Sequence, residues 1–118
     1  CCHASPQPSR HATSFHNLSV ADADAQTRAG AITLIDVRPP EERAIASVPV
    51  DYSGLENGGL ECLLALPKDT PLAFLCHHGG RSAQAAIYFA QQGFGDLYNV
   101  VGGIDAWSLQ VDPTVPRY

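Results

Sequence analysis

Short apolar runs alternate with amphipathic segments along most of the chain. The apolar runs have the length and composition of strands buried in a sheet. Helix-forming segments that end near glycine or proline separate these runs. Strands are expected at residues 32–37, 72–75 and 96–101, and helices at residues 20–29, 40–46, 60–66, 82–92 and 102–107. Strands that alternate with helices predict an α/β fold, a small open parallel β-sheet with helices on both faces.

Some segments fall outside this alternation. Residues 1–16 are rich in Pro, Ser, His and Ala and hold a single aromatic residue, Phe15. They are expected to form a flexible tail or linker before one domain at residues 17–118. Residues 47–59 and 112–118 are expected to be irregular. No apolar run follows the first basic residues, and the chain holds no Met, so we expect a processed protein or a piece of a longer one rather than a secretory precursor.

Composition and charge exclude several classes of protein. Hydrophobic residues make up 45% of the chain and charged residues 16%, which suits a globular domain. The formal net charge is −5 and no Lys/Arg run is present, which argues against binding to nucleic acid. No apolar stretch approaches the ~18 residues of a membrane-spanning helix. We therefore expect neither nucleic-acid nor membrane partners.

The four cysteines do not follow the spacing of a disulfide framework. A reducing compartment, the cytoplasm, is therefore expected, with at least one thiol kept for chemistry. Cys62 lies in an apolar segment and is expected to be a small buried hydrophobic residue rather than a second reactive thiol. Cys1 and Cys2 stand side by side at the chain end, and the sequence assigns them no role.

Cys76 directly follows an expected strand, at the edge of the sheet where open α/β folds place their sites. Two adjacent glycines and the start of a helix follow it. The glycines let successive backbone N–H groups turn toward one anion, and the helix adds free N–H groups and its positive dipole end. Such surroundings lower the pKa of a cysteine. The candidate loop therefore has Cys76 as nucleophile, and its other members are His77, His78, Gly79, Gly80, Arg81 and Ser82.

A thiolate in such a loop supports two kinds of reaction: attack on sulfur in an anionic donor, and attack on phosphorus or arsenic. The Cys-x4-Arg spacing is weak evidence alone, but its placement between a buried strand and a helix strengthens it. The alternative is a half-buried structural cysteine in a turn. The adjacent glycines and Arg81 argue against that alternative.

Three sequence blocks in the same order resemble the rhodanese-like domain family. Residues 76–82 (CHHGGRS) resemble its active-site loop, Cys-x-x-Gly-x-Arg-Ser, and residues 34–38 (LIDVR) and 101–107 (VGGIDAW) match the flanking blocks. The resemblance covers residues 17–110. Many members carry a Gly-His-Ile-Pro-Gly-Ala segment where this chain has residues 46–50 (ASVPV), a departure that bears on substrate preference more than on activity.

The resemblance implies a sulfurtransferase. Cys76 would take the outer sulfur of thiosulfate or of a persulfide, hold it as a persulfide, and pass it to cyanide or a thiol. The backbone N–H groups from His77 to Ser82 would hold the anionic persulfide, and no metal or organic cofactor would be needed. Because the chain looks most similar to bacterial rhodanese domains fused behind a small thiol-redox or iron–sulfur-related domain, such a protein, fused or separate, is an expected partner.

Two residues at the end of the neighbouring strand, Asp36 and Arg38, are expected near the cysteine loop. They could tune the loop, but a structural ion pair of Arg38 with Glu41 or Glu42 is the preferred interpretation. Gly102 and Gly103 are interpreted as a tight turn, and Trp107 is interpreted as a core residue.

His77 and His78 are interpreted as pocket-wall residues rather than metal ligands. Neighbours in an extended Cys-His-His run point to opposing sides of the chain, so three ligands converging from it would be strained. Two other functions stay open for the loop: a phosphatase or arsenate reductase, and a non-catalytic rhodanese-like binding module. Retention of Cys76, Gly79 and Arg81 argues against the binding module.

Overall fold

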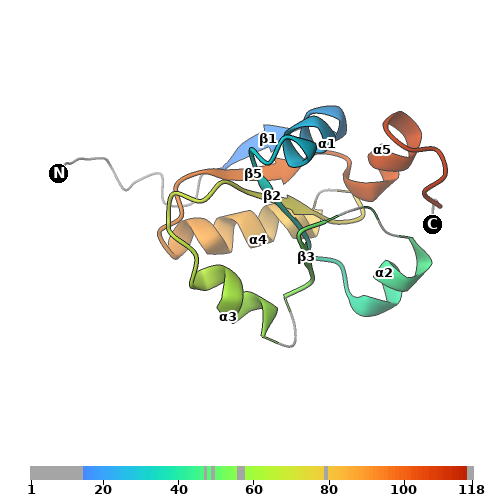
Figure 1. Cartoon of the computed structure of the whole chain (residues 1–118). Coiled ribbons are helices and arrows are strands. Elements are labelled where there is room, and N and C mark those ends of the chain that lie inside the picture. The colour runs from blue at the N-terminus through green and yellow to red at the C-terminus, as the bar shows by residue number, and fades with distance from the viewer. Residues whose placement is uncertain (1–14, 47, 49, 56–57, 79, 117–118) are drawn as a thin grey trace.

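The computed structural model describes residues 15–116 except residues 47, 49, 56–57 and 79. Parallel strands form one open sheet of five in the order β1-β5-β4-β2-β3 (Figure 1). The strands are β1 (His16–Leu18), β2 (Thr33–Asp36), β3 (Tyr52–Ser53), β4 (Leu72–Leu75) and β5 (Leu97–Val100). The helices are α1 (Val20–Arg28), α2 (Pro40–Ile45), α3 (Gly59–Leu64), α4 (Gly80–Gln91) and α5 (Gly103–Gln110). The predicted α/β fold is confirmed.

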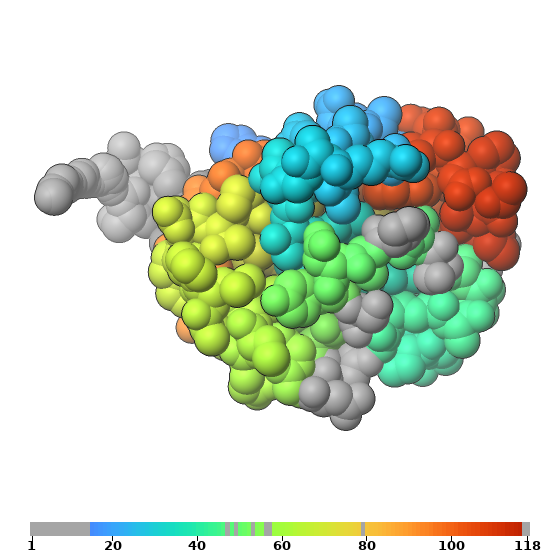
Figure 2. Space-filling model, viewed as in Figure 1, coloured from blue at the N-terminus to red at the C-terminus, as the bar shows by residue number. Residues whose placement is uncertain are grey.

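Helices cover both faces of the sheet, with α1 and α5 on one face and α3 and α4 on the other (Figure 1). Successive strand residues point to opposite faces. Leu34 and Leu75 pack with α1 and α5, including the buried Trp107. Ile35 and Phe74 pack with α3 and α4. The central strands are therefore buried on both sides, which is why they read as unbroken apolar runs in the sequence. Figure 2 shows the segment of α5 beside α1 on the surface.

The two edge strands were not predicted. β1 holds three residues, of which two are exposed, and β3 holds two residues within the segment expected to be irregular. Neither is long enough to show alternation, and each forms only because a longer strand offers its edge. His16 begins β1, so the sheet starts inside the segment expected to be a tail, and residues 1–14 lie outside the described part.

The helices begin and end close to the predicted residues. Ser19 caps α1 by accepting a hydrogen bond from the backbone N–H of Asp22 at 3.1 Å. After the helix, Gly30 adopts a positive φ of 75°. The longest helix, α4, has 12 residues, and none of the helices in the described ranges has the length and apolar character needed to cross a bilayer.

Candidate active site

Cys76 lies at the carboxyl end of β4, the middle strand of the sheet. All four β4 residues are buried, and Cys76 itself is only 1% exposed. β5 and β2 flank β4 on its two sides, so residues at the ends of three strands meet at this edge. The sequence predicts a candidate nucleophile at this edge, which is where parallel α/β sheets form their sites.

The first turn of α5 supports the backbone of the Cys76 loop. The N–H of Ile104 donates to the carbonyl of Cys76 at 2.8 Å, and the N–H of Asp105 donates to the carbonyl of His77 at 3.2 Å. Gly103 has a φ of +57°, and a Cβ there would lie 2.2 Å from the Cys76 carbonyl oxygen and 2.5 Å from that of His77. The glycine pair predicted as a tight turn thus has a second role that the sequence did not show: it lets α5 approach the loop.

A buried polar chain begins at the thiol. Cys76 Sγ lies 3.3 Å from Ser82 Oγ, and the Ser82 hydroxyl donates to Asn99 Oδ1. All three residues are buried. A hydroxyl has one proton, and because Asn99 accepts it, the Cys76 thiol is the donor to Ser82. Ser82, predicted to line the loop, therefore contacts the sulfur directly.

Asn99 was missed by the sequence analysis. It lies in β5, one of the apolar runs, and is 7% exposed. A polar side chain inside a buried strand needs a hydrogen-bond partner, and that requirement was the signal that could have singled it out. What the sequence could not show is that the partner is Ser82, at the start of α4.

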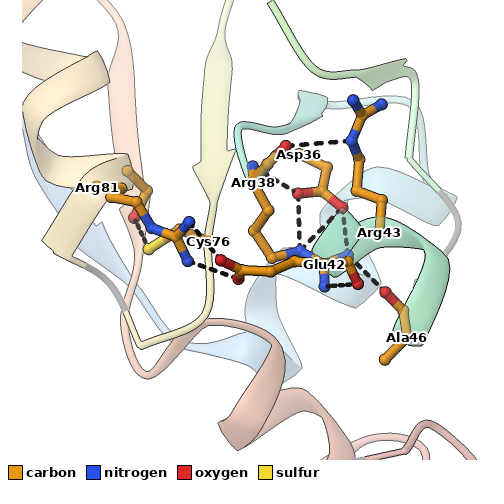
Figure 3. Close-up of polar contacts among 8 residues, drawn as sticks. Asp36, Arg38, Glu42, Arg43, Ala46, Cys76 and Arg81 are labelled. Atoms are coloured by element: carbon orange, nitrogen blue, oxygen red, sulfur yellow. Dashed lines mark hydrogen bonds and ion pairs between the residues drawn. The ribbon is translucent and has the colours of Figure 1, made fainter. Parts of the chain in front are cut away.

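Arg81 reaches from α4 to α2. Its guanidinium forms a two-pronged pair with the Glu42 carboxylate, at 2.8 and 2.7 Å (Figure 3). The Arg81 side chain is 44% exposed and that of Glu42 is 24% exposed, so solvent screens the pair and its net contribution to stability is about 1 kcal/mol or less. Arg81 therefore brings a positive charge to the Cys76 loop, and Glu42 partly neutralises it.

Arg38 forms its ion pair with Asp36, which corrects the predicted pairing with Glu41 or Glu42. The Arg38 Nη2–Asp36 Oδ2 distance is 2.6 Å, and both side chains are buried (Figure 3). Arg38 also donates to the main-chain carbonyls of Glu42 and Ala46, at 3.2 and 2.7 Å. The pair therefore fastens α2 to the end of β2. Removing one partner of such a buried pair costs about 3–5 kcal/mol.

The two loop histidines lie on the same side of the chain. Their rings stack with centroids 3.9 Å apart and planes 29° apart, whereas neighbouring positions in the sequence predict side chains on opposing sides. His77 is half-buried and His78 is exposed. Gly80 is the first residue of α4, and Gly79 lies outside the described residues.

Cys62 does not match its prediction. It was expected to be buried, but it is an exposed free thiol on α3. The apolar segment around it forms a helix, as predicted, but Leu63 rather than Cys62 is the residue of that helix that faces the core.

The fold and the loop together define an α/β domain with a buried thiol between a central strand and a helix N-terminus. The sequence pattern of the family described as "Rhodanese-like domain" matches residues 19–110, and the chain belongs to that family.

The relatives found by comparison include sulfurtransferases. The chain is 35% identical over 96 residues to "Thiosulfate sulfurtransferase GlpE" of Pseudomonas syringae, a match that covers 80% of this chain and 89% of the relative. It is 44% identical over 91 residues to "Rhodanese-like/PpiC domain-containing protein 12, chloroplastic" of Arabidopsis thaliana, covering 72% of this chain and 30% of that longer protein. Among solved structures, the polysulfide-sulfur transferase homodimer of Wolinella succinogenes has a TM-score of 0.67 at 34% identity, covering 86% of this chain and 79% of that one.

Proposed function

We propose that the chain is a thiosulfate sulfurtransferase in which Cys76 carries the transferred sulfur. The observation that supports this most is the placement of the buried Cys76 thiol beside Ser82 and the first turn of α4. A thiolate there lies where backbone N–H groups and the positive end of a helix dipole favour negative charge. The Pseudomonas syringae relative, named as a thiosulfate sulfurtransferase, is consistent with this assignment.

The proposed reaction has two steps. In the first, the Cys76 thiolate attacks the outer sulfur of thiosulfate, the S–S bond of the donor breaks, and sulfite leaves with the bonding electron pair. In the second, cyanide or a thiolate attacks the outer sulfur of the Cys76 persulfide and regenerates the Cys76 thiolate. A persulfide donor in place of thiosulfate releases a thiolate. The electron pairs balance in both steps without a metal or an organic cofactor.

The residues around Cys76 have distinct proposed roles. The backbone N–H groups from His77 to Ser82 bind the anionic persulfide, as the resemblance implies. The Ser82 hydroxyl, which accepts from the thiol in the resting state, rotates to donate to the thiolate or persulfide once the proton leaves. Arg81 attracts the anionic donor to the rim of the loop.

The length of the loop favours sulfur over phosphorus chemistry. From Cys76 through Arg81 the loop has six residues, whereas the phosphatases that it resembles use Cys-x5-Arg, one residue more. A shorter arc of N–H groups surrounds one sulfur atom, while a phosphoryl group needs three oxygens accommodated around the same ring. A misfit of about 1 Å costs ~100-fold in rate.

A paired assay tests this proposal. The unaltered protein is expected to convert thiosulfate and cyanide to thiocyanate and sulfite, and to hydrolyse aryl phosphates at least ~100-fold more slowly, because of that misfit. Both rates are measured on the same preparation. Faster phosphate hydrolysis would favour the phosphatase alternative, and the absence of both activities would favour a non-catalytic binding module.

A second prediction concerns the Arg81–Glu42 pair. Glu42→Gln keeps the size of the side chain and removes the charge that neutralises Arg81, so the doubly negative donor should be attracted more strongly. We expect the KM for thiosulfate to fall by about 2–5-fold at low salt, equivalent to ~0.4–1 kcal/mol, with kcat nearly unchanged. The difference should shrink as salt is added.

The matched control is Glu41→Gln, which removes the same charge from the neighbouring position of α2, where Glu41 is exposed. Its KM should stay close to that of the unaltered protein. Equal effects of the two substitutions would show that net charge acts, and not the contact with Arg81.

The partners and location are also proposals. Both described cysteines, Cys62 and Cys76, are free thiols, which is consistent with a reducing compartment such as the cytoplasm. A thiol-redox or iron–sulfur protein, fused or separate, is the proposed sulfur donor or acceptor in the cell, and thiosulfate, cyanide and small thiols are the substrates to test.

A further inference from the structure

Three side chains of types that bind metal ions lie close together at the Cys76 loop. His77 and His78 follow the nucleophile, and Asp105 lies in the first turn of α5. One ligand atom from each lies within 4.8 Å of the others. His78 Nε2 is 4.0 Å from Asp105 Oδ2. The rings of the two histidines stack, so both imidazoles lie on the same side of the chain.

The backbone holds the two elements together before any ion binds. The N–H of Asp105 donates to the His77 carbonyl, and the N–H of Ile104 donates to the Cys76 carbonyl. This close approach depends on Gly103, which has no Cβ to meet those carbonyls. Most of the entropy cost of bringing ligands from two elements into one place is therefore met by folding itself.

The exposures of the ligands suit an ion that enters from solvent. The Asp105 side chain is 21% exposed and His77 is half-buried, so both are held by their surroundings. The His78 side chain is 66% exposed, so its ring can leave the stack on His77 and rotate toward a common centre. Zinc–ligand distances of about 2.0–2.2 Å place tetrahedral ligand atoms about 3.4 Å apart. The present separations need to close by roughly 1 Å, which rotation of His78 and a small shift of Asp105 can supply.

We propose that His77, His78 and Asp105 form a binding site for one divalent transition-metal ion, with Zn²⁺ as the best match. Two imidazoles and one carboxylate suit a borderline ion and are a poor match for Mg²⁺ or Ca²⁺, which prefer all-oxygen ligands. Three protein ligands leave a fourth position for water or for an anion that approaches the thiol. The proposal rests on these three side chains alone and does not depend on the sulfur chemistry proposed above.

Zinc titration of the full chain tests the proposal. The protein is kept reduced at pH 7.5, and zinc is added in competition with a chromophoric chelator. His78→Ala and Asp105→Asn should each weaken one equivalent of zinc binding by at least ~10-fold relative to the unaltered protein. Any binding by the cysteines is common to all the proteins and cancels in this comparison.

The matched control is His16→Ala, which removes an exposed histidine from β1. It should bind as much zinc as the unaltered protein. Unchanged binding in both His78→Ala and Asp105→Asn would overturn the site, and so would an equal loss in His16→Ala, because that result would mean scattered binding to surface histidines. Circular dichroism of each variant shows whether a loss of binding reflects a loss of fold.

Discussion

Cys76→Ser is expected to abolish the uptake of sulfur from thiosulfate. A serine hydroxyl at neutral pH is not ionised and cannot form a persulfide, while Cys76 occupies a buried position at the end of β4 that no other described cysteine shares. The thiosulfate:cyanide rate should fall by at least ~10⁴-fold, as it does when other enzymes lose their nucleophile. The check is the intact mass after incubation with thiosulfate, which should rise by one sulfur atom in the unaltered protein and stay constant in the variant.

Cys62→Ser is the matched control for this prediction. Cys62 is the other described free thiol, and it is exposed on α3, so its replacement should disturb neither the core nor the site. The variant should gain one sulfur atom and retain the rate. If Cys76→Ser still gains the atom, or if Cys62→Ser loses the activity, the assignment of the nucleophile is wrong.

Gly103→Ala is expected to lower the free energy of unfolding by roughly 2–5 kcal/mol. Its φ of +57° costs an alanine about 1–2 kcal/mol. The new Cβ would also meet the carbonyl oxygens of Cys76 and His77, neither of which is the end of a flexible side chain. Relief requires the loop to move away from α5, and such a contact adds about 1–3 kcal/mol. A loop displaced by about 1 Å should also lose ~100-fold in sulfur transfer.

Gly30→Ala separates the two contributions. Gly30 has a comparable φ of +75°, but a Cβ there would meet no atom within 4 Å, so alanine should bear only the backbone cost. Urea unfolding of both variants measures the difference, and the thiosulfate:cyanide assay should find Gly30→Ala fully active. Equal destabilisation of the two variants would show that the close contact between α5 and the loop does not contribute to the free energy of unfolding.

Much of the fold was predictable because its signals are local. The three central strands are largely buried on both faces, so each reads as a mostly apolar run, and caps such as Ser19 lie beside the helix that they begin. The edge strands β1 and β3 carry no comparable signal, since their hydrogen bonds depend on the strand beside them. Cys62 was misplaced for a related reason: an apolar run does not show which side of a short helix faces the core.

The sequence by itself determined where the Cys76 loop lies, between a central strand and a helix, because a strand end, two glycines, an arginine and a helix start are all contiguous in the chain. The contacts around that loop were decided by the order of the strands. With β5 on one side of β4 and β2 on the other, Asn99 meets Ser82 and Glu42 meets Arg81, residues 17 and 39 positions apart. From the spacing in the sequence, Arg38 could pair with several carboxylates. In the structure it pairs with Asp36, because both side chains are buried beside the end of β2. Which of these pairs forms depends on which charged groups and hydroxyls are buried next to each other and so lose their hydration. Only the packed structure decides that.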